Sequence, residues 1–423
     1  MSKIAIIGTG YVGLTTGACF AHLGHDVICA DIDPEKIRRL QAGDVPILEP
    51  GLNEIVAEGL ENGNLTFVLG AATAAAECEF AYLCVPTPQG EDDRADLSYI
   101  EAAAAEIGPV LPSNAVVVNK STVPVGSTHV VERALKRPDV TVVSNPEFLR
   151  EGSAVHDFMH PDRIVIGADD RSAAVRVSSL FVGVTAPLIV TDPASAETIK
   201  YAANSFLATK ISFVNAIAAV CEAVGADVND VVLGMGSDPR IGERFLKPGP
   251  GWGGSCFPKD TRAMVRIAED AGYEFGLLEG VITVNDEQFE RVVNKVRNAV
   301  GGDLTGKQIA VLGLTFKANT DDMRDSPSIE VSTRLIAAGA KITAFDPAVH
   351  ADVGDIRVSD SAYTAAEDAD ALVVLTEWDE FRWLDWDKMR EQMSTSTMVD
   401  GRNLLDPATM RRKGFVYEGL GRP

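Results

Sequence analysis

The chain lacks several features that would mark whole classes of protein. None of its six cysteines lies in a Cys-x-x-Cys pair, no run of apolar residues approaches the length of a membrane span, and no secretory signal pattern occupies the first residues. We therefore expect reduced thiols and a cytoplasmic protein. His156 and His160 are four residues apart, but no third ligand lies nearby in the sequence, so we expect no metal site.

Positive charge is also scarce. The 423 residues include 38 Lys and Arg against 61 Asp and Glu, which gives a net charge of −23. This imbalance disfavours nucleic acid and anionic membranes as partners, so an anionic small molecule must be held by local cations and helix N-termini. The length suits two or three domains.

The N-terminal segment reads as a strand, a glycine turn and a helix. Gly8, Gly10 and Gly13 form Gly-x-Gly-x-x-Gly after a short apolar run. In this fingerprint the first glycine makes the turn, the second admits a pyrophosphate and the third lets the helix pack on the strand. A second strand ends in Asp31, 18 residues after Gly13, where a carboxylate can accept from a ribose hydroxyl and repel a 2′-phosphate. We expect a dinucleotide site that prefers NAD to NADP.

Strand-like and helix-like segments alternate up to about residue 190, which is typical of a doubly wound, mostly parallel sheet. Ala-rich helical patterns such as Ile100–Ile107 lie between several of the strands. The expected strands are Ile4–Ile7, Val27–Ala30, Leu65–Leu69, Phe80–Cys84, Val116–Asn119, Val140–Ser144, Arg163–Ile166 and Leu188–Val190.

A long helix is expected from Ala194 to about Val224, with further helices over 258–271 and 277–300. The strand and helix pattern restarts at Gly301, without the glycine fingerprint. Here we expect a buried strand over Lys307–Leu312, a helix over Ile329–Ala338 and a second strand over Lys341–Phe345 that closes in Asp346-Pro347. The sequence thus predicts an α/β protein with two Rossmann-like doubly wound domains joined by a helical middle with one long central helix. The expected domains are 1–190 for NAD, 191–300 for dimerisation unless this helical middle is only a spacer, and 301–423 for another ligand.

Cys256 follows a run of glycines and precedes a helix start at Pro258. The positive end of a helix favours the thiolate, which is the reactive form of cysteine. The alternative is a buried structural cysteine beside a flexible loop. Lys200 and Asn204 are four apart on the expected long helix, so they share a face. Glu147 and Glu151 are also four apart, as are Cys256 and Asp260 at the start of another helix. The alternative for each pair is an ordinary solvated helix face.

These residues belong to motifs that resemble the UDP-glucose/GDP-mannose 6-dehydrogenase family over essentially the whole chain. The resemblance rests on Gly-Tyr-Val-Gly13, Cys-Val-Pro-Thr-Pro88, Lys-Ser-Thr-Val-Pro-Val-Gly126, Asn-Pro-Glu-Phe-Leu-Arg-Glu-Gly152, the Lys200/Asn204 helix, Gly-Gly-Ser-Cys-Phe-Pro-Lys-Asp260 and Phe-Lys-Ala-Asn-Thr-Asp-Asp-Met-Arg-Asp325. It implies a homodimer, formed through the central helix, that makes two successive hydride transfers to NAD and converts a sugar C6 alcohol to a carboxylate.

The resemblance also implies a role for each matching residue. Cys256 would form a thiohemiacetal and then a thioester, Lys200 and Asn204 would stabilise the C6 oxygen, and Asp260, Thr122 and Glu147 would serve hydrolysis. The group that takes the first alcohol proton stays open. The implied NAD site comprises Gly8, Gly10, Tyr11, Val12, Gly13, Asp31, Lys36, Thr87, Ser121, Thr122, Glu151, Lys259 and Arg324. The implied substrate site comprises Glu147, Phe148, Leu149, Glu151, Lys200, Asn204, Phe245, Leu246, Lys247, Gly253, Cys256, Phe257, Phe316, Lys317 and Arg402, with Arg240 reaching in from the neighbouring subunit.

Several alternatives remain at this point. The substrate could be UDP-glucose, GDP-mannose or a UDP-N-acetylhexosamine. The segment around Cys256 most resembles the UDP-glucose branch of the family. A single-hydride enzyme like the hydroxyacid or 6-phosphogluconate dehydrogenases needs no nucleophilic cysteine, so Cys256 argues against it. A catalytically silent NAD-binding sensor would not need Cys256, Lys200 and Asp260 together.

Overall fold

The computed structural model describes residues 1–90 and 94–422, so the final residue of the domain expected to end at 423 lies outside it. The chain forms two compact units. The first comprises Met1–Ala203 and Arg262–Ala271, and the second comprises Asn204–Thr261 and the chain from Gly272 onward. The helices α9 (Pro193–Val224) and α11 (Phe257–Asp270) each begin in one unit and end in the other.

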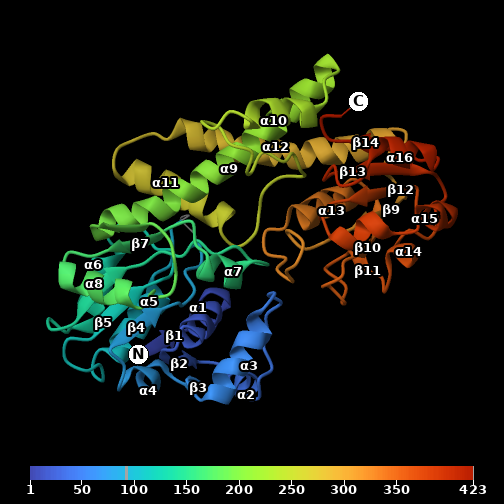
Figure 1. Cartoon of the computed structure of the whole chain (residues 1–423). Helices are drawn as coiled ribbons and strands as arrows, with labels where there is room; N and C mark the ends of the chain where they lie inside the picture. The colour runs from blue at the N-terminus through green and yellow to red at the C-terminus, as the bar shows by residue number, and fades with distance from the viewer. Residues whose placement is uncertain (91–93, 423) are drawn as a thin grey trace. The chain divides into compact units, whose positions relative to one another are not determined.

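The first unit is built on an eight-stranded sheet with the order β3-β2-β1-β4-β5-β6-β7-β8 (Figure 1). The order reverses between β1 and β4, which is the switch point at which such sheets bind ligands. All pairs are parallel except β6 with β7, which meet in one antiparallel pair. The strands are β1 (Lys3–Ile7), β2 (Asp26–Asp31), β3 (Leu65–Leu69), β4 (Phe80–Leu83), β5 (Val116–Asn119), β6 (Thr141–Ser144), β7 (Ile164–Gly167) and β8 (Leu188–Thr191).

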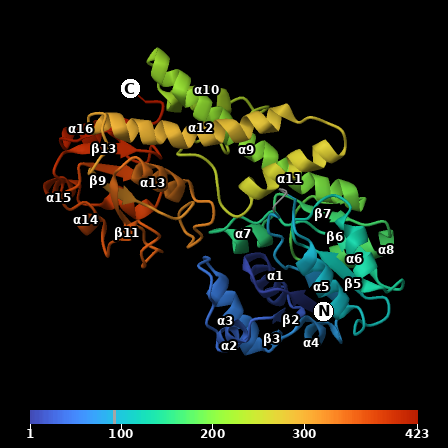
Figure 2. The same ribbon diagram turned by 180° about the vertical axis from the view of Figure 1, so that it is seen from behind.

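Helices cover both faces of this sheet because its central strands are apolar on both sides. One face packs on α1 (Tyr11–His22), α2 (Pro34–Gln41), α3 (Leu52–Asn62), α7 (Ala154–Met159) and α8 (Arg171–Ser179). The other face packs on α4 (Ala71–Ala75), α5 (Ser98–Ile107) and α6 (Ser127–Leu135). Both sets of helices can be followed in Figures 1 and 2.

The second unit holds a helical part and a second sheet. The helical part includes the end of α9, α10 (Val228–Gly236), the start of α11 and α12 (Gly276–Ala299). The six-stranded sheet is parallel throughout and has the order β11-β10-β9-β12-β13-β14. Its strands are β9 (Gln308–Leu312), β10 (Lys341–Phe345), β11 (Arg357–Val358), β12 (Ala371–Val374), β13 (Thr397–Asp400) and β14 (Val416–Gly419).

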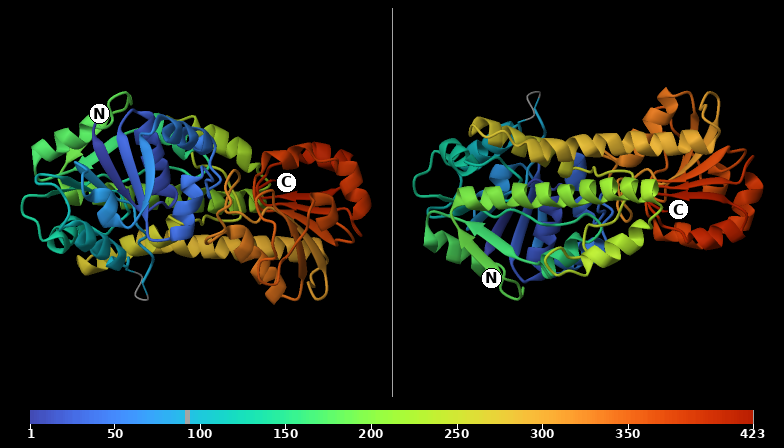
Figure 3. Two further views of the ribbon diagram at one scale, coloured as in Figure 1. Left: turned by 90° about the horizontal axis from the view of Figure 1, so that it is seen from below. Right: turned by 90° about the horizontal axis from the view of Figure 1, so that it is seen from above.

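The second sheet also lies between two layers of helices (Figure 3). One face packs on α12 and α13 (Pro327–Ala337), and the other on α14 (Ala362–Ala365), the 3-10 helix η1 (Asp379–Trp383), α15 (Trp386–Gln392) and α16 (Pro407–Arg412). The expected fold class is therefore confirmed: two doubly wound sheets, joined by a helical segment with one long helix.

The helix α9 is long and apolar enough to span a membrane, with an 18-residue window of mean hydropathy 1.5. It nevertheless carries buried polar residues whose partners are protein groups. Lys200 pairs with Glu147, Asn204 with Asp260, and Ser212 Oγ donates to the carbonyl of Val281. Because these polar groups are paired with protein groups, one face of α9 packs into the protein.

Candidate active site

The three fingerprint glycines have the geometry that a pyrophosphate needs. Gly8 has a φ of +97°, which a side chain would strain. A Cβ on Gly13 would lie 1.9 Å from the Gly8 carbonyl oxygen, so only glycine lets α1 pack this closely. Apart from Gly10 and its two chain neighbours, no described residue comes within 4 Å of where a Cβ on Gly10 would be, which leaves open space beside the N-terminus of α1. The cradle therefore fits a dinucleotide.

Asp31 at the end of β2 is a strongly held carboxylate. Its Oδ2 accepts from Thr9 N at 3.0 Å, Thr9 Oγ1 at 2.6 Å and Lys36 Nζ at 3.0 Å. Burial raises the pKa of Asp31, but the hydrogen bonds from Thr9 and Lys36 lower it by more, so the pKa falls to about 2. Asp31 is thus a fixed negative charge at neutral pH.

The loops after β4 and β5 bring together three residues of the expected NAD site, Thr87, Ser121 and Thr122. Thr87 Oγ1 donates to the Thr122 carbonyl at 2.9 Å, and Ser121 Oγ donates to the Val85 carbonyl at 2.7 Å. Tyr11 at the start of α1 contacts the carboxylate of Glu49, and its hydroxyl accepts from Gly152 N at 2.9 Å. These bonds fix the loops that border the switch point.

Glu147, three residues beyond β6, forms a buried ion pair with Lys200. Lys200 Nζ donates to Glu147 Oε1 at 2.7 Å, and each side chain is 5% exposed. Burial raises the pKa of Glu147, whereas the charge and hydrogen bond of Lys200 lower it by more, so the pKa lies below its ordinary value. The Arg163 guanidinium stacks on the Phe148 ring, with Cζ 3.6 Å from the ring centre. Lys200 Nζ lies 5.5 Å from the centre of the same ring.

Lys120 is a buried lysine beside this pair to which the sequence assigned no role. It directly follows β5 and donates from Nζ to Asn145 Oδ1 at 3.1 Å, while Asn145 Nδ2 donates to the Val165 carbonyl at 2.7 Å. Burial lowers the pKa of Lys120 to about 8, although the charge of Glu147 acts in the opposite direction. The sequence signal for a role of Lys120 was its position in the Lys-Ser-Thr motif. A polar residue after a strand does not by itself predict that its side chain is buried.

In the second unit, Cys256 directly precedes α11, as the sequence indicated. Its carbonyl accepts from Asp260 N at 2.9 Å, and its Sγ lies 3.6 Å from Ser255 Oγ. Asp260 is fully buried, with Oδ2 accepting from Asn204 Nδ2 at 2.6 Å and Oδ1 accepting from Lys259 Nζ at 2.6 Å. Asp260 in the first turn of α11 thus bonds to the Cys256 backbone through its N–H, and its carboxylate holds the Asn204 amide and the Lys259 ammonium group.

The glycines before Cys256 allow the loop to pack against the segment after β9. A Cβ on Gly253 would lie 1.9 Å from the Asp325 carbonyl oxygen, and a Cβ on Gly254 would lie 2.9 Å from the Phe316 ring. Arg402, which follows β13, donates to the Phe316 carbonyl at 3.2 Å. The loop, Phe316 and Arg402 therefore come together within this unit.

Three amide side chains that the sequence did not single out hold the same loop. Asn215 Oδ1 accepts from Gly249 N at 2.9 Å, and Gln288 Nε2 donates to the Gly249 carbonyl at 2.8 Å. Asn285 accepts from Trp252 N at 2.8 Å and donates to the Trp252 carbonyl at 3.0 Å. No local motif indicates these contacts, because they join α9 and α12 to a distant loop.

The other residues expected at the substrate site differ in their contacts and in their exposure to solvent. The rings of Phe245 and Phe257 meet edge to face, with their centroids 6.5 Å apart. Lys317 Nζ lies 5.2 Å from the centre of the Phe316 ring. Leu246 is 2% exposed and belongs to a buried apolar cluster, so it presents almost no surface to a ligand in this structure. Arg240 pairs with Asp238 and its side chain is 86% exposed.

The remaining expected positions lie on loops and helix starts of both units. Leu149 N donates to Glu147 Oε2 at 2.7 Å. Arg324 pairs with Asp322 at 2.6 Å and its side chain is 65% exposed. Glu151 and Lys247 lie in loops, and Val12 lies in α1. The structure thus gathers Glu147 and Lys200 in one unit and Cys256, Asp260 and Asn204 in the other.

Asp346 in the second sheet occupies the place that Asp31 occupies in the first, after the second strand of the unit. It is fully buried and accepts from Leu314 N at 2.7 Å, Thr315 N at 3.0 Å and Trp378 Nε1 at 3.1 Å. Because the Trp378 indole covers this carboxylate, Asp346 serves the fold. A fully buried carboxylate presents no surface to a ribose, which is a physical difference from the partly exposed Asp31 in the first sheet.

A glycine fingerprint on a doubly wound sheet, with a fixed acid after its second strand, defines an NAD-binding oxidoreductase. The chain belongs to the UDP-glucose/GDP-mannose dehydrogenase family. Its residues 2–185 match the family's NAD binding domain, 194–287 its central domain and 310–407 its UDP binding domain.

Similar curated proteins match over the full chain. The UDP-glucose 6-dehydrogenase of Rhizobium meliloti (strain 1021) is 48% identical, with 100% of both chains covered. The UDP-glucose 6-dehydrogenase TuaD of Bacillus subtilis (strain 168) is 46% identical, with 100% of this chain and 94% of that protein covered. A solved UDP-glucose dehydrogenase from Pyrobaculum islandicum has a TM-score of 0.92 at 38% identity, covering 100% of this chain and 98% of that one.

Proposed function

We propose that this protein oxidises UDP-glucose to UDP-glucuronate in a four-electron reaction that uses two NAD and proceeds through Cys256. The observation that carries the proposal is the cluster at the start of α11, where Asp260 holds Asn204 and Lys259 one turn after Cys256. A single-hydride dehydrogenase has no use for a thiol at this position. The similarity to curated UDP-glucose 6-dehydrogenases supports the choice of substrate.

The proposed chemistry uses the thiol to retain a reactive intermediate. The C6 alcohol loses a proton and a hydride and becomes an aldehyde. Cys256 Sγ then bonds to C6 as the carbonyl oxygen takes a proton. This thiohemiacetal loses a second hydride together with its hydroxyl proton and becomes a thioester. Water adds to the thioester and the carbon–sulfur bond breaks, which releases the carboxylate and restores the thiol. Gly8, Gly10 and Gly13 would hold NAD, and two NAD bound in turn would supply one hydride acceptor for each oxidation.

The other side chains act on charge and water in this scheme. Lys200 and Asn204 stabilise negative charge on the C6 oxygen, because fixed donors in a dry site cost no reorganisation during the reaction. Asp260 and Thr122 position water, and Glu147 serves hydrolysis as a carboxylate that Lys200 keeps ionised. These roles come from the family resemblance, and the buried ion pair and the Asp260 cluster support them.

The remaining parts of the proposal concern domains and assembly. We infer an NAD domain over 1–190, a dimerisation domain over 191–300 and a UDP-sugar domain over 301–423, in a cytoplasmic homodimer. Phe206, Phe213 and Val220 recur every seven residues on α9 and are 65%, 49% and 55% exposed. An exposed apolar stripe at this spacing is suited to packing against a second copy of the same helix.

The substrate is tested by offering a panel of sugar nucleotides to the full-length protein with NAD. The account predicts NADH release with UDP-glucose well above that with GDP-mannose or a UDP-N-acetylhexosamine. The panel is necessary because a similar solved structure, a UDP-D-ManNAc dehydrogenase from Pyrococcus horikoshii, has a TM-score of 0.89 at 29% identity. Turnover of a UDP-N-acetylhexosamine alone would overturn the choice of substrate.

A further inference from the structure

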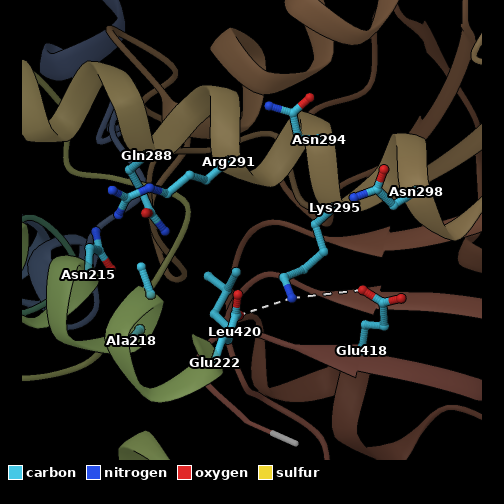
Figure 4. A pocket seen from close by; sticks show the side chains of 11 residues that line it. Asn215, Ala218, Glu222, Gln288, Arg291, Asn294, Lys295, Asn298, Glu418 and Leu420 are labelled. Carbon is cyan, nitrogen blue, oxygen red and sulfur yellow. Dashed lines mark ion pairs between the residues drawn. The ribbon is translucent and has the colours of Figure 1, made fainter. Parts of the chain in front are cut away.

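The glycine-rich loop before Cys256 is held by amide side chains from two different helices of the second unit. Asn215 on α9 accepts from Gly249 N at 2.9 Å, and Gln288 on α12 donates to the Gly249 carbonyl at 2.8 Å. The two side chains can be followed on their helices in Figure 4, and they are 1% and 2% exposed. Both backbone groups of one loop residue are therefore bonded to side chains that water hardly reaches.

Three residues further along the loop, Trp252 is held in the same way. Asn285 on α12 accepts from Trp252 N at 2.8 Å and donates to the Trp252 carbonyl at 3.0 Å. The Trp252 indole Nε1 donates to Ser212 Oγ on α9 at 2.9 Å. A side-chain amide carries an acceptor and donors together, so one buried Asn satisfies both backbone groups of the tryptophan.

The contacts of Trp252 extend to the far side of the cysteine. The Trp252 and Phe257 rings meet edge to face, with their centroids 6.4 Å apart. Phe257 is the first residue of α11 and directly follows Cys256. Between Trp252 and the cysteine, Gly253 and Gly254 have no side chain of their own to fix the backbone, and glycine loses the most conformational freedom when it is ordered. The bonds made to the loop backbone therefore decide where the thiol lies.

We propose that Asn285 and Gln288 are positioning residues for Cys256, which hold the loop so that the thiol stays at the start of α11. Neither residue touches the thiol, and each acts through the loop backbone that it bonds. Losing either amide leaves a buried backbone group without its partner, which favours a looser loop. The consequence for oxidation of UDP-glucose rests on the proposed function, whereas the effect on the thiol does not.

The test is the rate at which iodoacetamide alkylates each cysteine of the full-length protein, followed by peptide mass spectrometry. Cys256 is partly exposed, and the other five cysteines are buried, so they report on the rest of the fold. Asn285→Ala removes both bonds to the Trp252 backbone and should speed alkylation of Cys256 by about fivefold or more, as expected from the loss of a neutral hydrogen bond. The other five rates should not change.

Two further variants separate positioning from a loss of folding. Gln288→Met keeps the length of the side chain and removes only the donor to the Gly249 carbonyl, so Cys256 should react faster by a smaller factor. Asn298→Ala changes an exposed amide about three turns further along α12 and should react as wild type does (Figure 4). Thermal melts check that each variant folds.

The inference is overturned if Asn285→Ala and Gln288→Met both alkylate Cys256 at the wild-type rate. It is equally overturned if all six cysteines react faster together, because the amides would then serve only the overall stability. These rates need no turnover, so they stand even if the protein does not oxidise UDP-glucose. Where the wild type does oxidise it, kcat should fall about fivefold or more in Asn285→Ala with the KM for NAD unchanged, and an unchanged kcat would also overturn the inference.

Discussion

Lys200 Nζ donates to Glu147 Oε1 at 2.7 Å, and both side chains are almost completely buried. The pair joins α9 to the loop after β6 within the first unit. Removing one partner of a buried ion pair leaves the other charge uncompensated, which typically costs about 3–5 kcal/mol. We expect Lys200→Met to lower the free energy of unfolding by an amount of this order, measured by urea denaturation at neutral pH.

The same pair gives the protein an acid sensitivity of known sign. The pKa of Glu147 is lower in the folded chain than its ordinary value of 4.5, so the pair stabilises the fold above pH 4.5 and loses this effect as the pH falls below it. In Lys200→Met this depression is largely removed, so the stability lost between neutral and acid pH should be smaller than in wild type. An equal acid-induced loss in the two proteins would contradict the assignment.

Lys120 predicts a dependence at alkaline pH. Burial lowers its pKa from 10.5 to about 8 in the folded chain, so between these values the unfolded chain binds more protons than the folded one. Its contribution to the free energy of unfolding therefore rises with pH from about 8 to 10.5. Lys120→Met should remove this rise, as measured by denaturant midpoints across that range. A rise of undiminished size would mean that another group causes it.

Asp31 should select NAD over NADP. Its carboxylate is held ionised at the end of β2 by Thr9 and Lys36, where a ribose 2′-phosphate would meet a negative charge. Asp31→Ala should raise the KM for NAD and narrow the gap between the two cofactors in kcat/KM. A thermal melt of the variant controls for the loss of the Thr9 contacts. If the wild-type protein already prefers NADP, Asp31 does not select NAD and the prediction is wrong.

Arg240 should act on the active site of the neighbouring subunit. It lies in the loop after α10, and its exposed guanidinium pairs only with the nearby Asp238 among the described residues. Arg240→Ala should raise the KM for UDP-glucose with little change for NAD, as expected when binding contacts to the substrate are lost. Arg412→Ala, an exposed arginine on α16, is the matched control. A fully active monomer would contradict a role across subunits.

Much of the fold was accessible from the sequence because buried parallel strands are short apolar runs between glycine turns. The strands expected at Leu65–Leu69, Val116–Asn119 and Lys341–Phe345 have the bounds that the structure gives. The short polar helix α2 was not expected, because its helical tendency comes from the Asp33 cap and Pro34 rather than from an apolar stripe. The three strands β12, β13 and β14 were also not expected individually.

The candidate site was predictable where residue type and local spacing carry the chemistry, as for Cys256 and Asp260. Lys120 was missed because burial of a lysine depends on the neighbouring strands and on Asn145, which are distant in sequence. Asn215, Asn285 and Gln288 were missed for the same reason, since each is an ordinary helix residue until a distant loop packs against it.

The most direct test of the central claim is the number of NADH released per UDP-glucose consumed, measured together for the wild-type protein and Cys256→Ala. The account predicts two NADH per molecule of UDP-glucuronate formed by the wild type, and no net UDP-glucuronate from Cys256→Ala although NAD still binds. One NADH per substrate in the wild type, or two in Cys256→Ala at a near wild-type rate, would contradict the covalent four-electron mechanism.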